Sequence, residues 1–212
     1  MSEEFNVFVA GVGGMGILTA TRIIAESALK EGKNVIMSEV HGLSQRYGSV
    51  TAVVRIGNVY SPLIKKDFGD LLIGLEPIEA LRNINIVKEK EGYIILNTNQ
   101  IPPPNVAAGL EQYPNLEDII GVLRKRTEKL IAINALELAQ QIGSHLLQNT
   151  ILLGIAFTIP EFPLKKDSAR LVIKEIFSKK PKVVDMNLKA FDEGIRIGER
   201  ALKQLSYLEG FF

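Results

Sequence analysis

A glycine-rich turn near the start of the chain, Gly11-Val-Gly13-Gly14-Met-Gly16, limits the possible folds more than any other feature of the sequence. The turn follows an apolar run at residues 5–10, and it precedes apolar residues at helical spacing over residues 15–30. A buried strand, a tight turn and a helix in this order are typical of proteins in which strands and helices alternate. The opening of the chain therefore predicts an α/β fold.

The rest of the chain continues this alternation. A second strand at 34–38 is expected to run parallel to the first, after a right-handed crossover. Strands at 49–56 and 59–63, separated by the turn residues Gly57-Asn58, indicate an antiparallel hairpin. Apolar runs and helical spacing predict further strands at 71–75, 92–97 and 130–133 and helices at 77–86, 117–126, 135–142, 149–157, 168–177 and 187–205.

These elements predict a three-layer α/β/α fold, whose sheet is mostly parallel and carries an antiparallel hairpin. The segment 149–157 also suits a strand, but its length favours a helix. No repeat or linker divides the sequence, so we expect a single domain over residues 1–212.

The composition excludes several classes of function. Lys and Arg total 25 against 24 Asp and Glu, so the net charge of +1 is too small to attract nucleic acid or an anionic membrane. The chain contains no cysteine, which excludes disulfides, a cysteine nucleophile and cysteine ligands for an iron–sulfur cluster. His41 and His145 are the only histidines and lie far apart in the sequence. We therefore expect no metal-binding residues in this chain.

Signals for export or membrane insertion are not expected either. The sequence begins with the acidic stretch Met-Ser-Glu-Glu-Phe, rather than with the basic and then apolar order of a secretory signal. The longest apolar run, residues 151–159, is far shorter than the ~20 residues of a membrane-spanning helix. We therefore expect a cytoplasmic protein without a membrane partner.

The glycine turn is the first candidate binding site. Its spacing, between a strand and a helix, is that of dinucleotide-binding turns, in which phosphates approach the start of the helix. We assign cofactor binding to Gly11, Gly13, Gly14 and Gly16. In this assignment Gly11 permits the tight turn, Gly13 lets a phosphate approach the backbone, and Gly16 lets the helix pack closely on the strand. Glu39, at the end of the next strand, takes the place of the acid that binds a ribose. The alternative is that the glycines only form a compact turn.

The polar loop that follows the second strand is the other candidate site. Gln45, Arg46 and Ser49 would offer several hydrogen-bond donors to a carboxylate or phosphate, and Arg46 would offer two parallel ones. The alternative is that Arg46 forms an ion pair with Glu39 or Glu76 and holds the shape of the loop. No Ser-His-Asp order or metal-ligand spacing accompanies these loops, so we assign no catalytic residue.

Seven motifs carry a resemblance to a known family. They are the glycine turn, residues 39–50, Tyr60-Ser-Pro62-Leu, residues 74–82, Asn97 with Ile101-Pro102-Pro103, Asn149 with Leu153-Gly154, and residues 187–194. In this order they resemble the gamma-type family of 2-oxoacid:ferredoxin oxidoreductases, and within it the branch that oxidises indolepyruvate, where the equivalent chain is the beta subunit. The resemblance covers nearly the whole chain.

The resemblance implies a small subunit of a larger complex. Such a complex converts an aryl 2-oxoacid, coenzyme A and oxidised ferredoxin into acyl-CoA, carbon dioxide and reduced ferredoxin. Thiamine diphosphate and the iron–sulfur clusters lie on the larger partner subunit, and the family pattern allows coenzyme A at a site shared by the subunits. The isolated chain is expected to be inactive. Apolar residues at the C-terminal end also indicate a partner: Tyr207, Leu208, Phe211 and Phe212.

Two positions depart from the family pattern. Met15 occupies a position where the family usually has Gln, and Tyr47 one where it usually has Gly. These departures leave open a paralogue with another substrate, such as the gamma component of a pyruvate or ketoisovalerate enzyme. The sequence is also compatible with a free-standing NAD-binding dehydrogenase or regulator, and with a non-enzymatic assembly module. The motifs do not decide whether the two loops bind coenzyme A, thiamine diphosphate, another nucleotide or only the partner.

Overall fold

The computed structural model describes residues 4–41 and 48–209, apart from the side chains of residues 41, 104 and 207–209. The strands are β1 (Glu4–Val12), β2 (Val35–His41), β3 (Ser49–Gly57), β4 (Leu71–Gly74), β5 (Tyr93–Asn97) and β6 (Leu130–Ile133). The α-helices are α1 (Ile17–Lys30), α2 (Pro77–Arg82), α3 (Pro104–Ala107), α4 (Leu116–Arg126), α5 (Ala135–Ile142), α6 (Gln148–Ala156), α7 (Lys166–Ile176) and α8 (Pro181–Glu209). Short 3-10 helices are η1 (Ile84–Ile86) and η2 (His145–Leu147).

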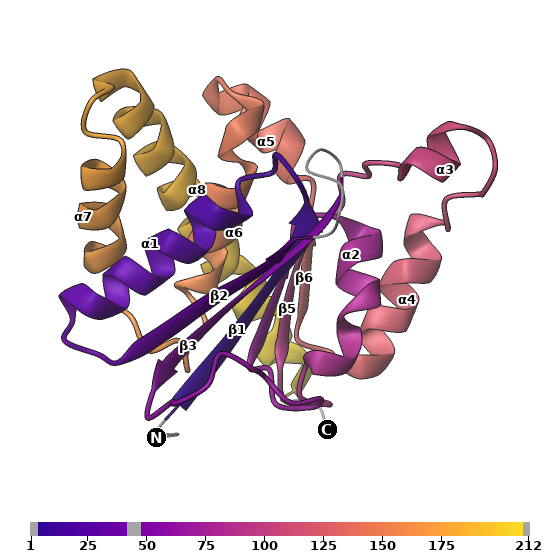
Figure 1. Ribbon diagram of the computed structural model, residues 1–212, viewed down its shortest axis with the longest axis horizontal. Coiled ribbons are helices and arrows are strands. Elements are labelled where there is room, and N and C mark those ends of the chain that lie inside the picture. Colours follow the sequence, from indigo (N-terminus) through magenta and orange to yellow (C-terminus); the bar gives the residue numbers. More distant parts are fainter. Residues whose placement is uncertain (1–3, 42–47, 210–212) are drawn as a thin grey trace.

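The strands form one sheet between two layers of helices (Figure 1). Their order is β2-β3-β1-β4-β5-β6. Neighbouring strands from β1 through β4 and β5 to β6 pair in parallel, whereas β3 is antiparallel to both β1 and β2. Among the described strands, β3 alone therefore runs against the others. The predicted three-layer α/β/α fold with an antiparallel component is confirmed.

The predicted place of the hairpin, however, is wrong. Residues 59–63 form no strand, and β3 pairs instead with β2, which precedes it. Since β3 lies between β2 and β1, both of its edges are occupied and a return strand finds no free edge. The Arg55 guanidinium of β3 also donates to the carbonyl oxygens of Ser61 and Leu63 at 2.7 and 3.1 Å. The same order separates β2 from β1, so these two strands run in the same direction without being neighbours.

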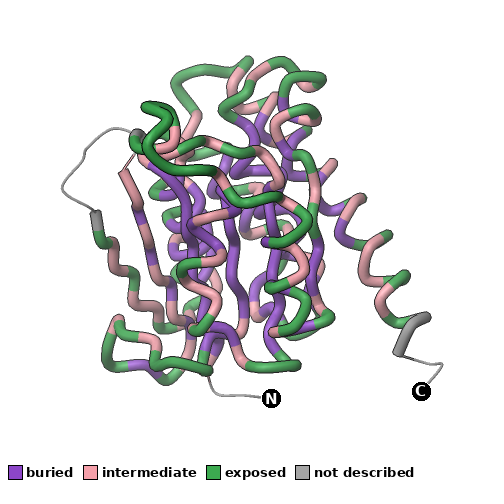
Figure 2. Tube along the Cα trace, turned by 90° about the vertical axis from the view of Figure 1, so that its right-hand side faces the viewer, coloured by how far each residue is buried: buried purple, intermediate pink, exposed green. Residues whose placement is uncertain are grey.

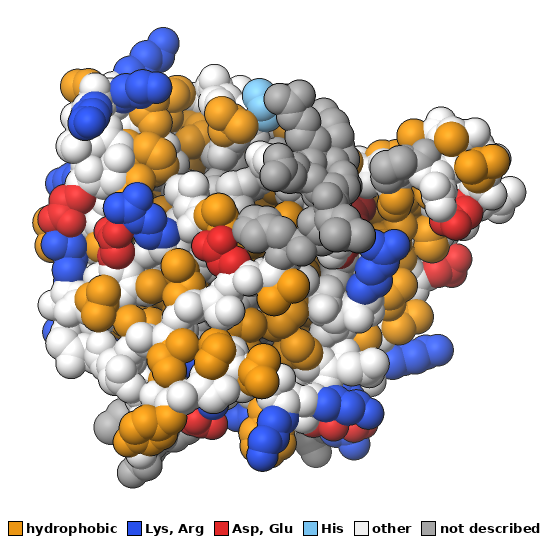
Figure 3. Space-filling model, in the orientation of Figure 1, with side chains coloured by type: hydrophobic (Ala, Val, Ile, Leu, Met, Phe, Trp, Pro, Cys, Tyr) orange, Lys and Arg blue, Asp and Glu red, His pale blue; other side chains and the backbone are white. Residues whose placement is uncertain are grey.

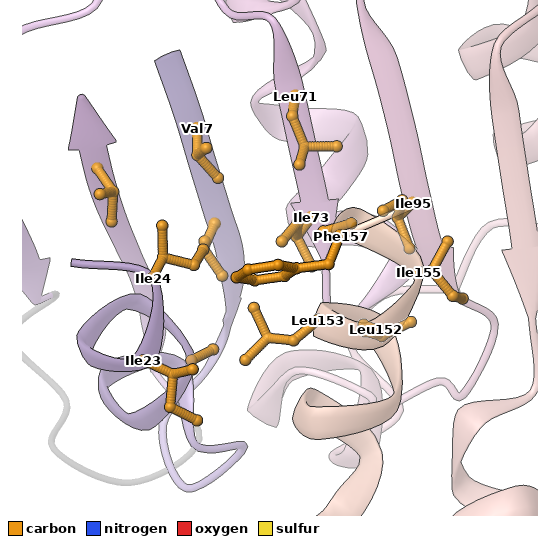
Figure 4. Packing of buried hydrophobic residues seen from close by; sticks show 14 of the residues in the cluster. Val7, Ile23, Ile24, Leu71, Ile73, Ile95, Leu152, Leu153, Ile155 and Phe157 are labelled. Atoms are coloured by element: carbon orange, nitrogen blue, oxygen red, sulfur yellow. The ribbon is translucent and has the colours of Figure 1, made fainter. Parts of the chain in front are cut away.

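The two sides of the sheet bury separate apolar clusters. On one face, Val7 and Ile73 of the sheet pack against Ile24 of α1 and Phe157, the residue after α6 (Figure 4). On the other face, sheet residues such as Leu72 pack against α2 and α4. The central strands are accordingly buried along most of their length (Figure 2). Because both faces of the sheet are apolar, each face must be covered by a layer of helices.

α6 explains the ambiguous apolar segment near residue 150. Every residue of this helix is buried, because α6 lies between the sheet and α8 and presents no face to solvent. A helix buried all round has no polar stripe, so its sequence does not show helical periodicity. The prediction of a helix, which was based on length, is confirmed.

α8 is longer than its sequence pattern predicted. It begins at Pro181 instead of Asn187, because proline lacks a backbone N–H and suits the first turn of a helix. The carbonyl of Lys180 accepts hydrogen bonds from Val183 and Val184, which completes that first turn. Although α8 has 29 residues, no helix in the described part of the chain is both long enough and apolar enough to cross a membrane.

Candidate functional site

The glycine turn connects β1 to α1 and depends on backbone angles that favour glycine. Gly14 and Gly16 have φ angles of 97° and 78°, in the left-handed region. A Cβ atom on Gly16 would lie 2.3 Å from Nδ2 of Asn149, which itself donates to the Gly16 carbonyl at 2.9 Å. Gly16 therefore allows the start of α1 to approach the start of α6, whereas the sequence analysis expected close packing on a strand.

The other two glycines of the motif, Gly11 and Gly13, make close contacts within the protein, and the assignment of cofactor binding to the four glycines stays a prediction. Gly11 lies inside β1, where a Cβ atom would come within 2.9 Å of the Leu75 Cβ, so it permits close strand neighbours rather than the turn itself. The backbone N–H of Gly13 donates to the Gly48 carbonyl at 2.9 Å. This amide is therefore occupied within the protein, and it fastens the end of the β2–β3 connection to the glycine turn.

The start of α1 is left favourable for an anion. Its N-cap residue, Gly16, makes no side-chain capping bond, and the first turn contains no acidic residue. The partial positive charge at the N-terminus of this 14-residue helix is therefore not neutralised by a neighbouring carboxylate of the first turn. Such helix ends attract phosphate and carboxylate groups.

A crevice of about 430 Å³ opens beside the glycine turn. Its lining comes from three separate segments: Gly13, Gly14, Met15, Ile101, His145, Leu146 and Gln148. β1 and β4 are neighbours, yet the helix after β1 packs on one face of the sheet and the helix after β4 packs on the other. Where the helices that follow two neighbouring strands leave to opposite faces, a crevice forms outside the carboxyl ends of the strands. This is the usual ligand site of open α/β sheets.

A network of buried amide side chains fixes Gln148, one of the residues that line the crevice. Asn97, at the end of β5, donates to the Leu75 carbonyl at 3.1 Å and to Oε1 of Gln148 at 2.9 Å. Its Oδ1 accepts from the backbone of Ala135 at 3.0 Å. Gln148 in turn donates to the His145 carbonyl at 2.8 Å. Both ends of the Gln148 amide are thus used inside the protein, so this side chain shapes the crevice.

A pair of buried carboxylates lies at the start of α2. Glu76 is the N-cap residue, and its Oε2 accepts from the Glu79 backbone at 3.0 Å. The Glu79 side chain accepts from the Ser49 hydroxyl at 2.6 Å and forms an ion pair with Arg82 at 2.5 Å. These contacts give both acids a structural role at the start of α2.

The predicted loop residues are only partly placed. Gln45 and Arg46 lie outside the described residues, so their proposed contacts stay predictions. Ser49 donates its one hydroxyl hydrogen to Glu79 and thereby fixes the start of β3 to α2. Glu39 is half-buried on β2, and because β3 separates β2 from β1, it lies two strand spacings, roughly 10 Å, from the strand that carries the glycine turn. The ligand-binding roles of Ser49 and Glu39 also stay predictions.

The crevice contains residues that the sequence analysis did not select. Ile101, Leu146 and Gln148 line it, together with the exposed His145. The sequence held two signals for them: Ile101 belongs to one of the seven family motifs, and residues 148–150 are the polar start of an otherwise apolar helix. Within the described residues, no three His, Cys, Asp or Glu side chains are grouped so that they could hold a metal ion.

Comparisons with known proteins match this chain over nearly its whole length. Residues 6–197 match the family described as pyruvate ferredoxin/flavodoxin oxidoreductase. Indolepyruvate oxidoreductase subunit IorB of Archaeoglobus fulgidus is 45% identical over 191 residues, which cover 90% of this chain and 94% of that protein. Ketoisovalerate oxidoreductase subunit VorA of Methanothermobacter marburgensis is 28% identical over 194 residues, which cover 91% of this chain and 36% of that longer protein.

A solved structure confirms the fold. Pyruvate oxidoreductase subunit PORC of Thermotoga maritima superposes with a TM-score of 0.68 at 19% sequence identity, over 91% of this chain and 96% of that chain. The resemblance that was inferred from seven sequence motifs is therefore confirmed by the family match and by relatives of similar length.

Proposed function

Because the chain belongs to the pyruvate ferredoxin/flavodoxin oxidoreductase family, we propose that it is the small subunit of an oxidoreductase that acts on indolepyruvate or a similar aryl 2-oxoacid. The observation that supports this most is the 45% identity to an indolepyruvate oxidoreductase subunit of nearly equal length. The relative from the ketoisovalerate enzyme is more distant, at 28% identity. The aryl substrate is therefore favoured over the pyruvate and ketoisovalerate alternatives.

In the proposed reaction, a two-electron oxidation cleaves carbon dioxide from the 2-oxoacid and joins the remaining acyl group to the sulfur of coenzyme A, while ferredoxin accepts the electrons and the thiol proton is released. Thiamine diphosphate supplies the carbon–carbon bond cleavage, and iron–sulfur clusters supply the electron path. This chain has no cysteine to ligate a cluster. We therefore assign the clusters to a larger partner subunit, and we assign thiamine diphosphate to the same subunit because the family resemblance implies it.

The proposed contribution of this chain is binding and orientation at a shared site. The uncapped start of α1 and the neighbouring crevice offer backbone dipoles and an apolar wall that includes Met15, Ile101 and Leu146. A volume of about 430 Å³ suits part of a coenzyme-sized ligand. We propose that the crevice holds part of coenzyme A and that the larger subunit completes the site.

Reconstitution tests the proposed function. The chain and the larger subunit from the same organism would be co-expressed and purified without oxygen, and 2-oxoacid-dependent reduction of ferredoxin would be followed in the visible spectrum. We expect a coenzyme A-dependent rate with indolepyruvate at least tenfold above the rates with pyruvate and ketoisovalerate, and no rate with either subunit alone. A preference for pyruvate, or activity of this chain by itself, would contradict the proposal.

Met15 offers a test of coenzyme A binding in the crevice. Met15→Glu places a carboxylate at the glycine turn, so we expect the KM for coenzyme A to rise at least tenfold, or ~1.4 kcal/mol, through repulsion of an anionic ligand. Met15→Gln has nearly the same shape without the charge and serves as the matched control, with a change below threefold. Equal KM values for the two variants would exclude an anion at this turn.

Arg46 offers a test of the predicted loop contact. We propose that its guanidinium binds an anionic group at the junction with the partner, because a nearly neutral chain must concentrate positive charge where it handles an acid. Arg46→Lys keeps the charge but loses the planar pair of donors, so turnover of the complex should fall more than tenfold, ~1.4 kcal/mol, with unchanged folding. Full turnover of both the Lys and the Ala variants would indicate a structural or solvent-exposed arginine.

A further inference from the structure

Residues 101–115, in the connection between β5 and α4, form an arm that stands away from the rest of the protein (Figure 1). It includes the short helix α3, and the residues from 105 to 112 are exposed except for the half-buried Val106. Leu110, near its tip, has 77% of its surface exposed. Figure 3 shows hydrophobic side chains on this projection at the upper right of the molecule. Residues 105–112 of the arm therefore present apolar groups to solvent.

The arm is also poor in charge. Glu111 is the only charged residue among residues 101–115, although charged residues make up 23% of the whole chain. A segment that only needed to be soluble would have no reason to lack charge, whereas depletion of charged residues is characteristic of the centre of protein–protein interfaces. The composition of the arm therefore indicates contact with another protein surface.

Glu76 holds both ends of the arm. This carboxylate is 1% exposed, and its Oε1 accepts hydrogen bonds from the backbone of Ile101, at 3.3 Å, and from the hydroxyl of Tyr113. Burial, followed by the hydrogen bond to Glu76, raises the pKa of Tyr113, so its hydroxyl remains a donor at neutral pH. The ring of Tyr113 packs against the cluster beneath α2 and α4. The two ends of the arm are thus fixed to one buried oxygen atom.

Hydrogen bonds within the arm keep its shape. The backbone of Ala107 donates to Pro103 and that of Leu110 donates to Asn105, both at 2.9 Å. Gly109 allows the turn between them with a φ of 74°. A contact element that is already ordered before binding loses little conformational freedom when it binds. The arm therefore combines exposure, apolar character and a fixed conformation.

We propose that the 101–115 arm is a preorganised element that docks into an apolar concave surface of the larger subunit, with Glu76 and Tyr113 as positioning residues. This inference rests on the proposed function. Ile101, the first residue of the arm, also lines the crevice, so a subunit bound to the arm lies beside the site that it helps to complete. In the ketoisovalerate relative the matching unit makes up 36% of one longer polypeptide, which places further protein permanently next to such a unit.

Two substitutions of exposed leucines test the docking. Leu110→Asp adds a charge at the tip of the arm, and the matched control Leu171→Asp adds one on α7, at the opposite side of the molecule in Figure 1, where Leu171 is 53% exposed. Kd for the larger subunit would be measured by titration of the labelled small subunit. We expect Leu110→Asp to raise Kd at least tenfold and Leu171→Asp to change it less than threefold. Equal effects of the two variants would overturn the proposal.

Tyr113→Phe tests the positioning role, because it removes the hydroxyl while the ring remains. We expect amide hydrogen exchange over residues 105–112 to become at least tenfold faster, exchange in β4 and β5 to stay unchanged, and Kd to rise at least threefold. Unchanged exchange or unchanged Kd would overturn this role.

The oligomeric state and the wild-type control separate the remaining outcomes. If the isolated chain is a dimer by light scattering, and Leu110→Asp makes it monomeric while the complex still forms normally, the arm binds a second copy and the proposal is overturned. If the unmodified chain binds no larger subunit, the proposed function itself fails, and the docking proposal fails with it. Normal wild-type binding with an unaffected Leu110→Asp variant overturns the arm proposal alone.

Discussion

Replacing Gly154 with Ala is expected to lower the free energy of unfolding by about 3 kcal/mol or more, because overpacked cores lose this much when the backbone cannot adjust. A Cβ atom at Gly154 would lie 2.1 Å from the carbonyl oxygen of Phe191 and 2.8 Å from the Cα of Gly194. These are backbone atoms of α8, so no side-chain rotation relieves the clash. α6 and α8 would have to separate, and buried contacts around Phe191 would be lost.

Urea denaturation of the isolated chain measures this effect, and two further variants sharpen it. Gly121→Ala on α4 is the matched control, since a Cβ atom there has no neighbour within 4 Å, and the loss of backbone entropy in the unfolded chain should stabilise the protein by ~0.5–1 kcal/mol. In Gly194→Ala the added Cβ atom would lie 2.0 Å from the Ile151 carbonyl oxygen, so this variant should lose about as much stability as Gly154→Ala. Both substitutions push α6 and α8 apart at the same place. The free energy of unfolding of the double variant should therefore fall by less than the sum of the two single effects. A Gly154→Ala protein as stable as the control would contradict this account of the helix packing.

Asn97→Ala is expected to destabilise the chain by ~3 kcal/mol, since each buried partner left without a hydrogen bond costs about 1–3 kcal/mol. The fully buried amide of Asn97 joins the Leu75 carbonyl, Gln148 and the backbone of Ala135, which belong to three different segments. The substitution leaves these groups unpaired and removes the hydrogen bond that holds Gln148, which lines the crevice. The KM of the complex for coenzyme A should therefore rise as well.

Thermal or urea unfolding of the isolated chain, together with coenzyme A titration of the complex, measures the two effects. Asn58→Ala is the control, because Asn58 is exposed and its side chain bonds only to the exposed hydroxyl of Tyr60 among the hydrogen bonds resolved for it. We expect its free energy of unfolding to change by less than ~0.5 kcal/mol. If Asn97→Ala lost no more stability than Asn58→Ala, the Asn97 amide would not be what holds the three segments together.

Local signals were sufficient for most of the secondary structure. α5 has the predicted bounds because Asn134 caps its start and Gly143, with a φ of 128°, ends it. α2 begins where Pro77 follows the capping carboxylate of Glu76. In each case the residues that decide the boundary lie within one helical turn of it, so the sequence contains the whole cause.

Pairing between strands was not determined locally. The alternating pattern of β3 suits pairing with the segment before it or with the segment after it. The Gly57-Asn58 turn favoured pairing with residues 59–63, which is wrong. The structure places β3 between β2 and β1, where nine consecutive residues pair with β1. That choice depends on the total apolar area that all strands bury together, which no single segment encodes.

The candidate site also has a part that the sequence determined and a part that only the tertiary structure determined. The sequence by itself determined the fold class, the family, the absence of cysteine ligands and the glycine turn, because composition and short motifs carry this information directly. Only the tertiary structure decided that Ile101, Leu146 and Gln148 meet at that turn, that the Gly13 amide is already occupied, and that Glu76 fixes both ends of the arm. These contacts join residues far apart in the chain, and they form because burial of the two apolar clusters brings the carboxyl ends of β1, β4 and β5 to one edge of the sheet.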